Sequence, residues 1–196
     1  MTTREMIERS LARSIEAKQS FARSGAETLV RLAETVIRAM RAGNKLLIFG
    51  NGGSAADAQH VAAEFVNRFL INRRPLPALA LTTDSSVLTS IGNDFSYDLV
   101  FVKQIQALGR PGDVALGIST SGTSPNVLQA LVTARELGLD TAALIGGLRP
   151  PSAELLAAAE LILQVPSAHT PHIQEAHLWA EHLLCEMVEK ELCGAG

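Results

Sequence analysis

The stretch KLLIFGNGGSAAD at residues 45–57 decides the fold. A short and mostly apolar run, residues 45–49, lacks the alternation of a half-exposed strand and is typical of a strand buried on both faces of a parallel sheet. It runs into a glycine-rich turn that opens a helix, where free backbone N–H groups can bind an anion. The stretch therefore predicts a strand–turn–helix unit with an anion site at the turn.

Similar units follow along the chain. Further short apolar runs that look like buried strands lie at residues 77–81, 113–118, 141–145 and 161–165. Helical patterns lie between and after them, at residues 54–70, 85–91, 99–108, 125–137, 152–159 and 172–192. Alternating strands and helices predict an α/β fold with right-handed crossovers, here a three-layer α-β-α sandwich around a five-stranded parallel sheet.

Helical spacing of apolar residues also covers the region before the sheet, from Arg4 to Met40. The pattern breaks near Ser24 and Gly25, which predicts two N-terminal helices. Ile7, Leu11 and Ile15 offer an apolar face for partner helices. No Pro/Gly/Ser-rich linker interrupts the middle of the chain, so we expect one domain over residues 1–196, with residues 1–40 contributing to oligomerisation.

Composition narrows the function classes. The chain has 196 residues, of which 47% are hydrophobic, and a formal net charge of −3, which argues against disorder. Lys and Arg are scattered, so no nucleic-acid surface is expected. Cys185 and Cys193 match neither a zinc motif nor a secreted disulfide framework. Residues 1–19 lack the apolar run of a signal peptide or membrane span, so we expect a cytoplasmic protein with no membrane partner.

A second loop resembles the first in its position. The sequence STSGTS at residues 119–124 follows the strand at 113–118 and precedes Pro125, at an expected first helical position. Both loops leave the carboxyl ends of parallel strands, so they border one crevice there. Either loop alone is equally well explained as a helix cap, but together they favour a sugar phosphate as ligand. Neither matches a nucleotide-binding fingerprint.

Candidate acid/base groups lie on the helix predicted at residues 54–70. One face is expected to be apolar, with Ala58, Ala62, Phe65, Val66 and Phe69. His60, Glu64 and Arg68 lie on the opposite side. Because His60 and Glu64 are four residues apart, they could share a metal or a proton transfer, the alternative being a solvated polar face.

Histidines crowd into the segment that leads into and runs along the last predicted helix. Four of the five lie there: His169, His172, His177 and His182. His177 and His182 point about 140° apart on a helix and cannot both face one site. Gln174 and His182 lie about 80° apart and two turns from each other, so both can overlook a cleft of sugar length. His177 and Glu181 are then expected to face a partner subunit or solvent.

Taken together, these motifs resemble a known family. They are the residues 50–54, His60, Glu64, the GND at residues 92–94, the GISTSG at residues 117–122 and the IQEAH at residues 173–177. From about residue 5 to residue 192 the chain closely resembles the sedoheptulose 7-phosphate isomerases (phosphoheptose isomerases), sugar isomerase (SIS) domain proteins with a flavodoxin-like fold.

The resemblance implies conversion of sedoheptulose 7-phosphate to D-glycero-D-manno-heptose 7-phosphate. This is the first step toward nucleotide-activated heptose for the lipopolysaccharide core or other surface glycans. It also implies a cytoplasmic homotetramer with active sites between subunits and one zinc ion per subunit.

Site residues carry over from the family by position. Phosphate would be held by Ser119, Thr120, Ser121 and Ser124. The sugar would contact Asn51, Gly52, Gly53, Ser54, Asn93 and Asp94, with Arg68, Glu64 and Gln174 as further substrate contacts. The acid/base pair maps onto Glu64 and His182. The zinc ligands map onto His60, Glu64, Gln174 and His182.

These roles suit the chemistry of moving a carbonyl between C2 and C1. A base must remove a proton next to the carbonyl, and an acid must serve the neighbouring oxygen through an enediol. We expect Glu64 to be the base and His182 the acid. A metal beside them would polarise the substrate oxygens or serve a structural role.

Two positions depart from the family pattern. His172 stands where relatives often carry Arg, and GGLRPP at residues 146–151 replaces the usual turn. Two alternatives also stay open. One is a non-catalytic tetramer of the same fold that binds the replication initiator protein, whose pattern lacks the Glu64 and His182 pair. The other is an isomerase of another sugar phosphate.

Overall fold

The apolar runs form the predicted parallel sheet. In the computed structural model, which describes residues 1–194, the strand order is β2-β1-β3-β4-β5. The strands are β1 (Leu46–Gly50), β2 (Ala78–Ala80), β3 (Val114–Ser119), β4 (Asp140–Gly146) and β5 (Leu161–Val165). From β1 the chain adds β2 on one side and then β3 on the other, so the carboxyl edge between β1 and β3 is a topological switch point.

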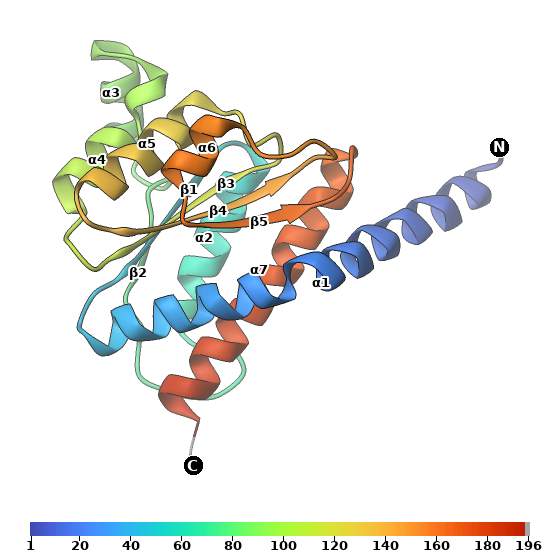
Figure 1. Ribbon diagram of the computed structural model, residues 1–196, viewed down its shortest axis with the longest axis horizontal. Helices are drawn as coiled ribbons and strands as arrows, with labels where there is room; N and C mark the ends of the chain where they lie inside the picture. Colours follow the sequence, from blue (N-terminus) through green and yellow to red (C-terminus); the bar gives the residue numbers. More distant parts are fainter. Residues whose placement is uncertain (195–196) are drawn as a thin grey trace.

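Helices cover both faces of the sheet (Figure 1). They are α1 (Thr3–Arg41), α2 (Gly53–Val66), α3 (Ser85–Asp94), α4 (Val102–Leu108), α5 (Pro125–Glu136), α6 (Ala153–Ala158) and α7 (Thr170–Cys193), with a 3₁₀ turn at Tyr97–Leu99. Within residues 1–194, no helix combines the length and the apolar character that a membrane span requires.

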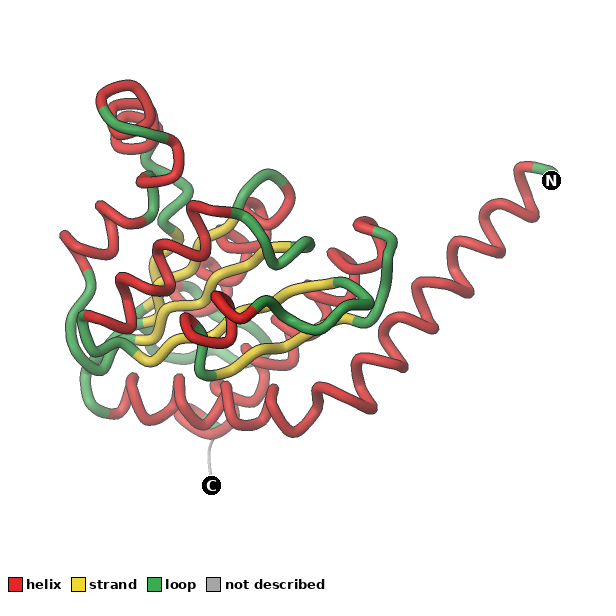
Figure 2. The backbone as a smooth tube through the Cα atoms, turned by 45° about the horizontal axis from the view of Figure 1, so that its top comes forward, coloured by secondary structure: helices red, strands yellow, loops and turns green. Residues whose placement is uncertain are grey.

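Alternate strand residues point into two separate cores. Leu46 and Ile48 pack with α1, α2 and α7, while Leu47 and Phe49 pack with α4, α5 and α6. Side chains of a strand alternate between the faces of its sheet, so both faces are apolar and both are covered. The predicted three-layer α-β-α sandwich is confirmed (Figure 2). Residues 195 and 196, which the domain prediction includes, lie outside the described part.

The prediction of two N-terminal helices is wrong. A single helix, α1, runs for 39 residues through Ser24 and Gly25. Gly25 serves packing here, because a Cβ at this position would lie 2.6 Å from the ring of Phe21, which is buried. The first part of α1 extends away from the sheet and leaves Ile7 and Leu11 exposed (Figure 1).

The predicted end of the second helix is also wrong. Helix α2 ends at Val66 rather than at residue 70, so Val66 is exposed and Phe69 and Arg68 lie beyond the helix. The face that is buried consists of Ser54, Ala58, Val61, Ala62 and Phe65. The helix stops early because Arg73 folds back and donates to the carbonyl oxygens of its last turn.

Candidate active site

The two predicted anion loops are neighbours. Strands β1 and β3 pair directly, so the turns after them lie at one edge of the sheet. The side-chain amides of Asn51 and Asn126 donate to each other, at 2.8 and 2.9 Å. The hydroxyl of Tyr97 donates to the Oδ1 atom of Asn51 at 3.1 Å. The glycine-rich turn is therefore fastened to the start of α5 and to the turn after α3.

Hydroxyl groups converge in the loop at residues 119–124. The Oγ atom of Ser119 lies 3.0 Å from that of Ser124 and 3.4 Å from that of Ser121. The backbone N–H of Gly122, at φ +68°, donates to the same Ser119 oxygen at 3.2 Å. Ser124 precedes the first residue of α5 but makes no side-chain cap bond. The loop thus gathers hydroxyl donors at a helix N-terminus, an arrangement that suits a phosphate group.

Helices α2 and α7 bring together three of the predicted site residues. The Nε2 atoms of His60 and His182 are 2.8 Å apart, and His60 Nε2 lies 3.6 Å from Glu64 Oε1. The ring of Phe69 stacks on His182, with centroids 5.6 Å apart and planes 17° apart. The i,i+4 pair predicted on α2 is thus completed by a residue 122 positions away.

Gln174 joins the same region at the start of α7. Its side-chain amide lies against Gly53, so closely that a Cβ on Gly53 would collide with it. Gly53 and Gln174 therefore pack together where α2 and α7 both begin. Ser54, next along α2, is buried beneath the turn.

Other predicted contacts lie at the surface. Arg68 is exposed beyond the end of α2, off the helical face where it was expected with His60. Asn93 and Asp94 are exposed at the end of α3, where the Asn93 amide donates to Asp94 at 2.8 Å. In the part of the chain that the structure describes, no hydrogen bond joins these three residues to His60, Glu64 or His182, so their roles stay predictions.

The expectation for His177 and Glu181 is wrong. Their exposed fractions are 0% and 1%, so neither faces solvent or a partner. His177 lies under the sheet edge, with Nε2 3.0 Å from the carbonyl oxygen of Ile145. Burial lowers the pKa of His177 to about 4, although this bond opposes the shift.

One buried carboxyl group, Glu181, and one half-buried carboxyl group, Asp57, have raised pKa values near the site. Burial, together with the nearby charge of Asp57, raises the pKa of Glu181 to about 8. Burial likewise raises the pKa of Asp57, and His60 partly opposes that rise. Glu181 is therefore largely protonated at neutral pH.

The residues predicted to bind zinc are His60, Glu64, Gln174 and His182. Imidazole and carboxylate are ordinary zinc ligands, whereas an amide is a weak one. The two imidazole Nε2 atoms face each other at 2.8 Å, slightly less than the roughly 3.3 Å between two nitrogens on one tetrahedral zinc. Within residues 1–194, however, no three His, Cys, Asp or Glu side chains are gathered for a metal ion. The donor types fit, and a small opening of the imidazole pair would be needed.

Comparisons with known proteins agree with this fold. The SIS domain family matches residues 11–146. The phosphoheptose isomerase of Clostridium acetobutylicum is 48% identical, over 97% of both chains. The solved phosphoheptose isomerase of Neisseria gonorrhoeae is 42% identical, covers 96% of this chain and 100% of its own, and superposes with a TM-score of 0.89. That of Francisella tularensis is 34% identical, with a TM-score of 0.91, 97% of this chain covered and 100% of its own.

The chain belongs to the phosphoheptose isomerase family of SIS domain proteins.

Both departures from the family pattern, His172 and the turn at residues 146–151, make defined contacts in the structure. His172 is buried beside Glu175, with Nδ1 3.7 Å from its carboxylate, and the Ser14 hydroxyl of α1 donates to that carboxylate. The turn at residues 146–151 is fastened by the Gln164 amide, which donates to the carbonyl oxygens of Gly147 and Arg149 at 2.9 and 2.7 Å. Both departures therefore lie outside the His60–His182 group.

Sequence reasoning missed several residues that hold the site. Asn126 had a weak signal, since it follows Pro125 at the end of the hydroxyl-rich loop. Tyr97, Arg73 and Glu189 had none, because each acts on a residue far away in the chain.

Proposed function

We propose that this protein interconverts sedoheptulose 7-phosphate and D-glycero-D-manno-heptose 7-phosphate. The observation that carries the proposal is the pairing of Glu64 on α2 with His182 on α7, bridged by His60. Full-length similarity to phosphoheptose isomerases supports the substrate. The hydroxyl cluster at residues 119–124 supplies a site for its phosphate.

Substrate binding would use the sheet edge. The hydroxyls of Ser119, Thr120, Ser121 and Ser124, with the N-terminus of α5, would hold the phosphate as hydrogen-bond donors. The turn from Asn51 to Ser54 would then lie along the sugar chain. Phosphate held at one end places the carbonyl end of the sugar toward α2 and α7.

The chemical step is a proton transfer through an enediol. Glu64 removes a proton from C1 of the ketose while His182 donates a proton to the C2 carbonyl oxygen. The enediol then collapses: the O1 hydroxyl gives its proton to His182, and Glu64 returns a proton to C2. The product is the aldose, and both side chains regain their starting states.

Zinc, when bound by His60, Glu64, Gln174 and His182, would supply Lewis-acid polarisation of the substrate oxygens. A carboxylate that ligates zinc tightly is a weaker base, so the metal and the base role of Glu64 compete. Removing the metal with a chelator and measuring turnover separates a catalytic metal from a structural one.

We also propose a homotetramer with its active sites between subunits, located in the cytoplasm. The N-terminal part of α1 supports the assembly, since the apolar side chains exposed on it are Met6, Ile7, Leu11 and Ile15. Such a stripe on a projecting helix is normally covered by another chain. Replacing Leu11 with Glu should lower the sedimenting mass without loss of helical circular dichroism. A wild-type monomer at micromolar concentration would contradict the assembly.

The function is tested by proton NMR of the purified protein with five-, six- and seven-carbon ketose phosphates. Signals of a new aldose phosphate from sedoheptulose 7-phosphate alone, or fastest from it, would support the proposal. Preferred turnover of a shorter ketose would assign another sugar-phosphate isomerase. No turnover of any of them, with or without added zinc, would contradict the enzyme. The proposed pathway role, supply of nucleotide-activated heptose, follows from the product, because later phosphoryl- and nucleotidyl-transfer reactions must act on it.

A further inference from the structure

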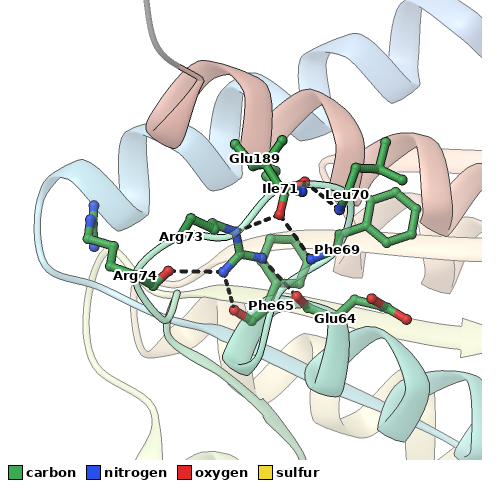
Figure 3. Close-up of polar contacts among 8 residues, drawn as sticks. All are labelled: Glu64, Phe65, Phe69, Leu70, Ile71, Arg73, Arg74 and Glu189. Carbon is green, nitrogen blue, oxygen red and sulfur yellow. Dashed lines mark hydrogen bonds and ion pairs between the residues drawn. The ribbon is translucent and has the colours of Figure 1, made fainter.

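A buried ion pair lies behind the candidate site, between α7 and the segment that follows α2 (Figure 3). Arg73 Nε lies 2.8 Å from Glu189 Oε1, and both side chains are 3% exposed. A buried pair is costly to desolvate, so its remaining donors and acceptors need partners. The Arg73 guanidinium finds them in three carbonyl oxygens, those of Glu64 at 2.8 Å, Phe65 at 2.9 Å and Arg74 at 3.0 Å.

The Glu189 carboxylate is satisfied in the same way. It accepts from the backbone N–H groups of Phe69 at 2.9 Å, Leu70 at 2.7 Å and Ile71 at 3.1 Å. Burial alone would raise the pKa of Glu189, but these N–H groups and Arg73 outweigh it and hold the pKa below its ordinary value. The three backbone N–H groups and Arg73 Nε therefore all donate to an ionised carboxylate.

Arg73, the cation of the pair, determines where α2 ends. The last turn of a helix leaves carbonyl groups without partners, and a cation there is favourable. Helix α2 has no basic residue in its last turn, so the cation comes from Arg73 in the loop. Because Arg73 binds the carbonyl of Glu64 itself, it fixes the backbone that carries the proposed base.

Glu189, the anion of the pair, is connected to His182 through Phe69. Glu189 holds the backbone of Phe69, and the ring of Phe69 stacks on the His182 imidazole at 5.6 Å. Glu189 and His182 are seven residues apart on α7, so they lie within about 20° on the same face. The same ion pair thus acts on Glu64 through its carbonyl and on His182 through Phe69.

We propose that Arg73 and Glu189 are positioning residues that align the two members of the acid/base pair, Glu64 and His182. Neither touches reacting atoms. The proposal rests on the isomerase function for its kinetic readout but not for its structural one. It differs from a purely stabilising role because it predicts which atoms move when the pair is broken.

The test compares Glu189→Gln with Glu191→Gln. Glu191, on the same helix, pairs with Arg41 at 2.6 Å, but the two side chains are 55% and 58% exposed. In protein labelled with ¹⁵N- and ¹³C-histidine, Glu189→Gln should shift the ring signals of His182, which lie in the ring current of Phe69. Glu191→Gln should leave them in place.

Kinetics supply the second readout. Glu189→Gln should lower kcat for the heptose phosphate about 10- to 100-fold, since small misplacements of catalytic groups have effects of this size. KM should stay within about twofold, because the loop at residues 119–124, which would bind the phosphate, makes no hydrogen bond with the Arg73–Glu189 pair in the described part of the chain. Glu191→Gln should retain wild-type kcat and KM.

Two further variants test the proposal even if the Glu189→Gln protein fails to fold. Phe69→Leu leaves the ion pair intact but removes the stack, and it should also move the His182 signals and lower kcat. Arg73→Lys keeps the charge but reaches fewer carbonyls, and it should give a smaller loss of kcat. Unmoved His182 signals and wild-type kcat in the folded variants would overturn the proposal. Shifted His182 signals in a protein without isomerase activity would instead retain the positioning role and contradict the proposed function.

Discussion

The hydroxyl loop at residues 119–124 and the histidine–glutamate group on α2 and α7 are built in different ways. The loop is local: its hydroxyls bond to one another within six residues, directly after a fully buried strand. The group on α2 and α7 joins His60 to His182 across 122 positions and depends on a buried ion pair behind it. We infer that substrate binding is the robust half of the site, whereas chemistry is the half that distant changes can disturb.

Removing either member of the proposed acid/base pair should have the largest effect. Glu64→Gln and His182→Ala are each expected to lower kcat by about 10²- to 10⁴-fold, the usual contribution of general acid–base catalysis. KM should change little, because neither residue belongs to the hydroxyl loop. Steady-state kinetics on sedoheptulose 7-phosphate measure both quantities. A variant that keeps wild-type kcat would remove that residue from the mechanism.

Removing hydroxyls from the loop at residues 119–124 should raise KM more than it lowers kcat. Ser119→Ala and Ser124→Ala each delete a hydroxyl from the loop, and a hydrogen bond to a charged phosphate contributes about 1.5–3 kcal/mol. We expect KM to rise roughly 10- to 100-fold with a smaller change in kcat. If kcat falls while KM stays constant, the division of the site into a binding half and a chemical half is incorrect.

A buried histidine on α7, His177, sharpens the comparison. His177 is buried with a pKa of about 4, so the unfolded chain takes up its proton near pH 6.5 and the folded protein only near pH 4. Between these values the unfolded state binds more protons, and the free energy of unfolding falls as pH falls. This single group contributes a slope of at most about 1.4 kcal/mol per pH unit.

His177→Gln should therefore flatten the loss of stability between pH 6.5 and pH 4.5, measured by urea unfolding at several pH values. His169→Gln, at an exposed position before α7, is the matched control and should leave the slope as in wild type. Parallel curves for wild type and His177→Gln would show that burial of His177 is not linked to folding in this way.

Most of the sheet could be predicted from the sequence because short apolar runs and glycine-rich turns are local signals. Each predicted strand overlaps an observed one, with ends that differ by at most one residue. The predicted break in α1 was wrong because Gly25 is needed against Phe21, a contact that periodicity does not reveal. The predicted end of α2 was wrong because Arg73, from the following loop, caps it.

In the candidate site, too, the local features could be predicted and the contacts between distant segments could not. The two loops and the His60–Glu64 spacing are readable from neighbouring residues. The meeting of His60 with His182, the amide pair of Asn51 and Asn126, and the Arg73–Glu189 pair all join distant segments. Such contacts carry no periodic signal in one sequence, since only the packed fold brings the partners together.

The most direct test of the central claim is to follow sedoheptulose 7-phosphate by NMR in D₂O with wild type and with Glu64→Gln. We expect wild type to form the aldose phosphate with solvent deuterium at C2 to the extent that the proton taken up by Glu64 exchanges with solvent before Glu64 returns a proton to C2. Glu64→Gln should form the aldose at least about 100-fold more slowly. Aldose formation by Glu64→Gln at the wild-type rate would contradict the account.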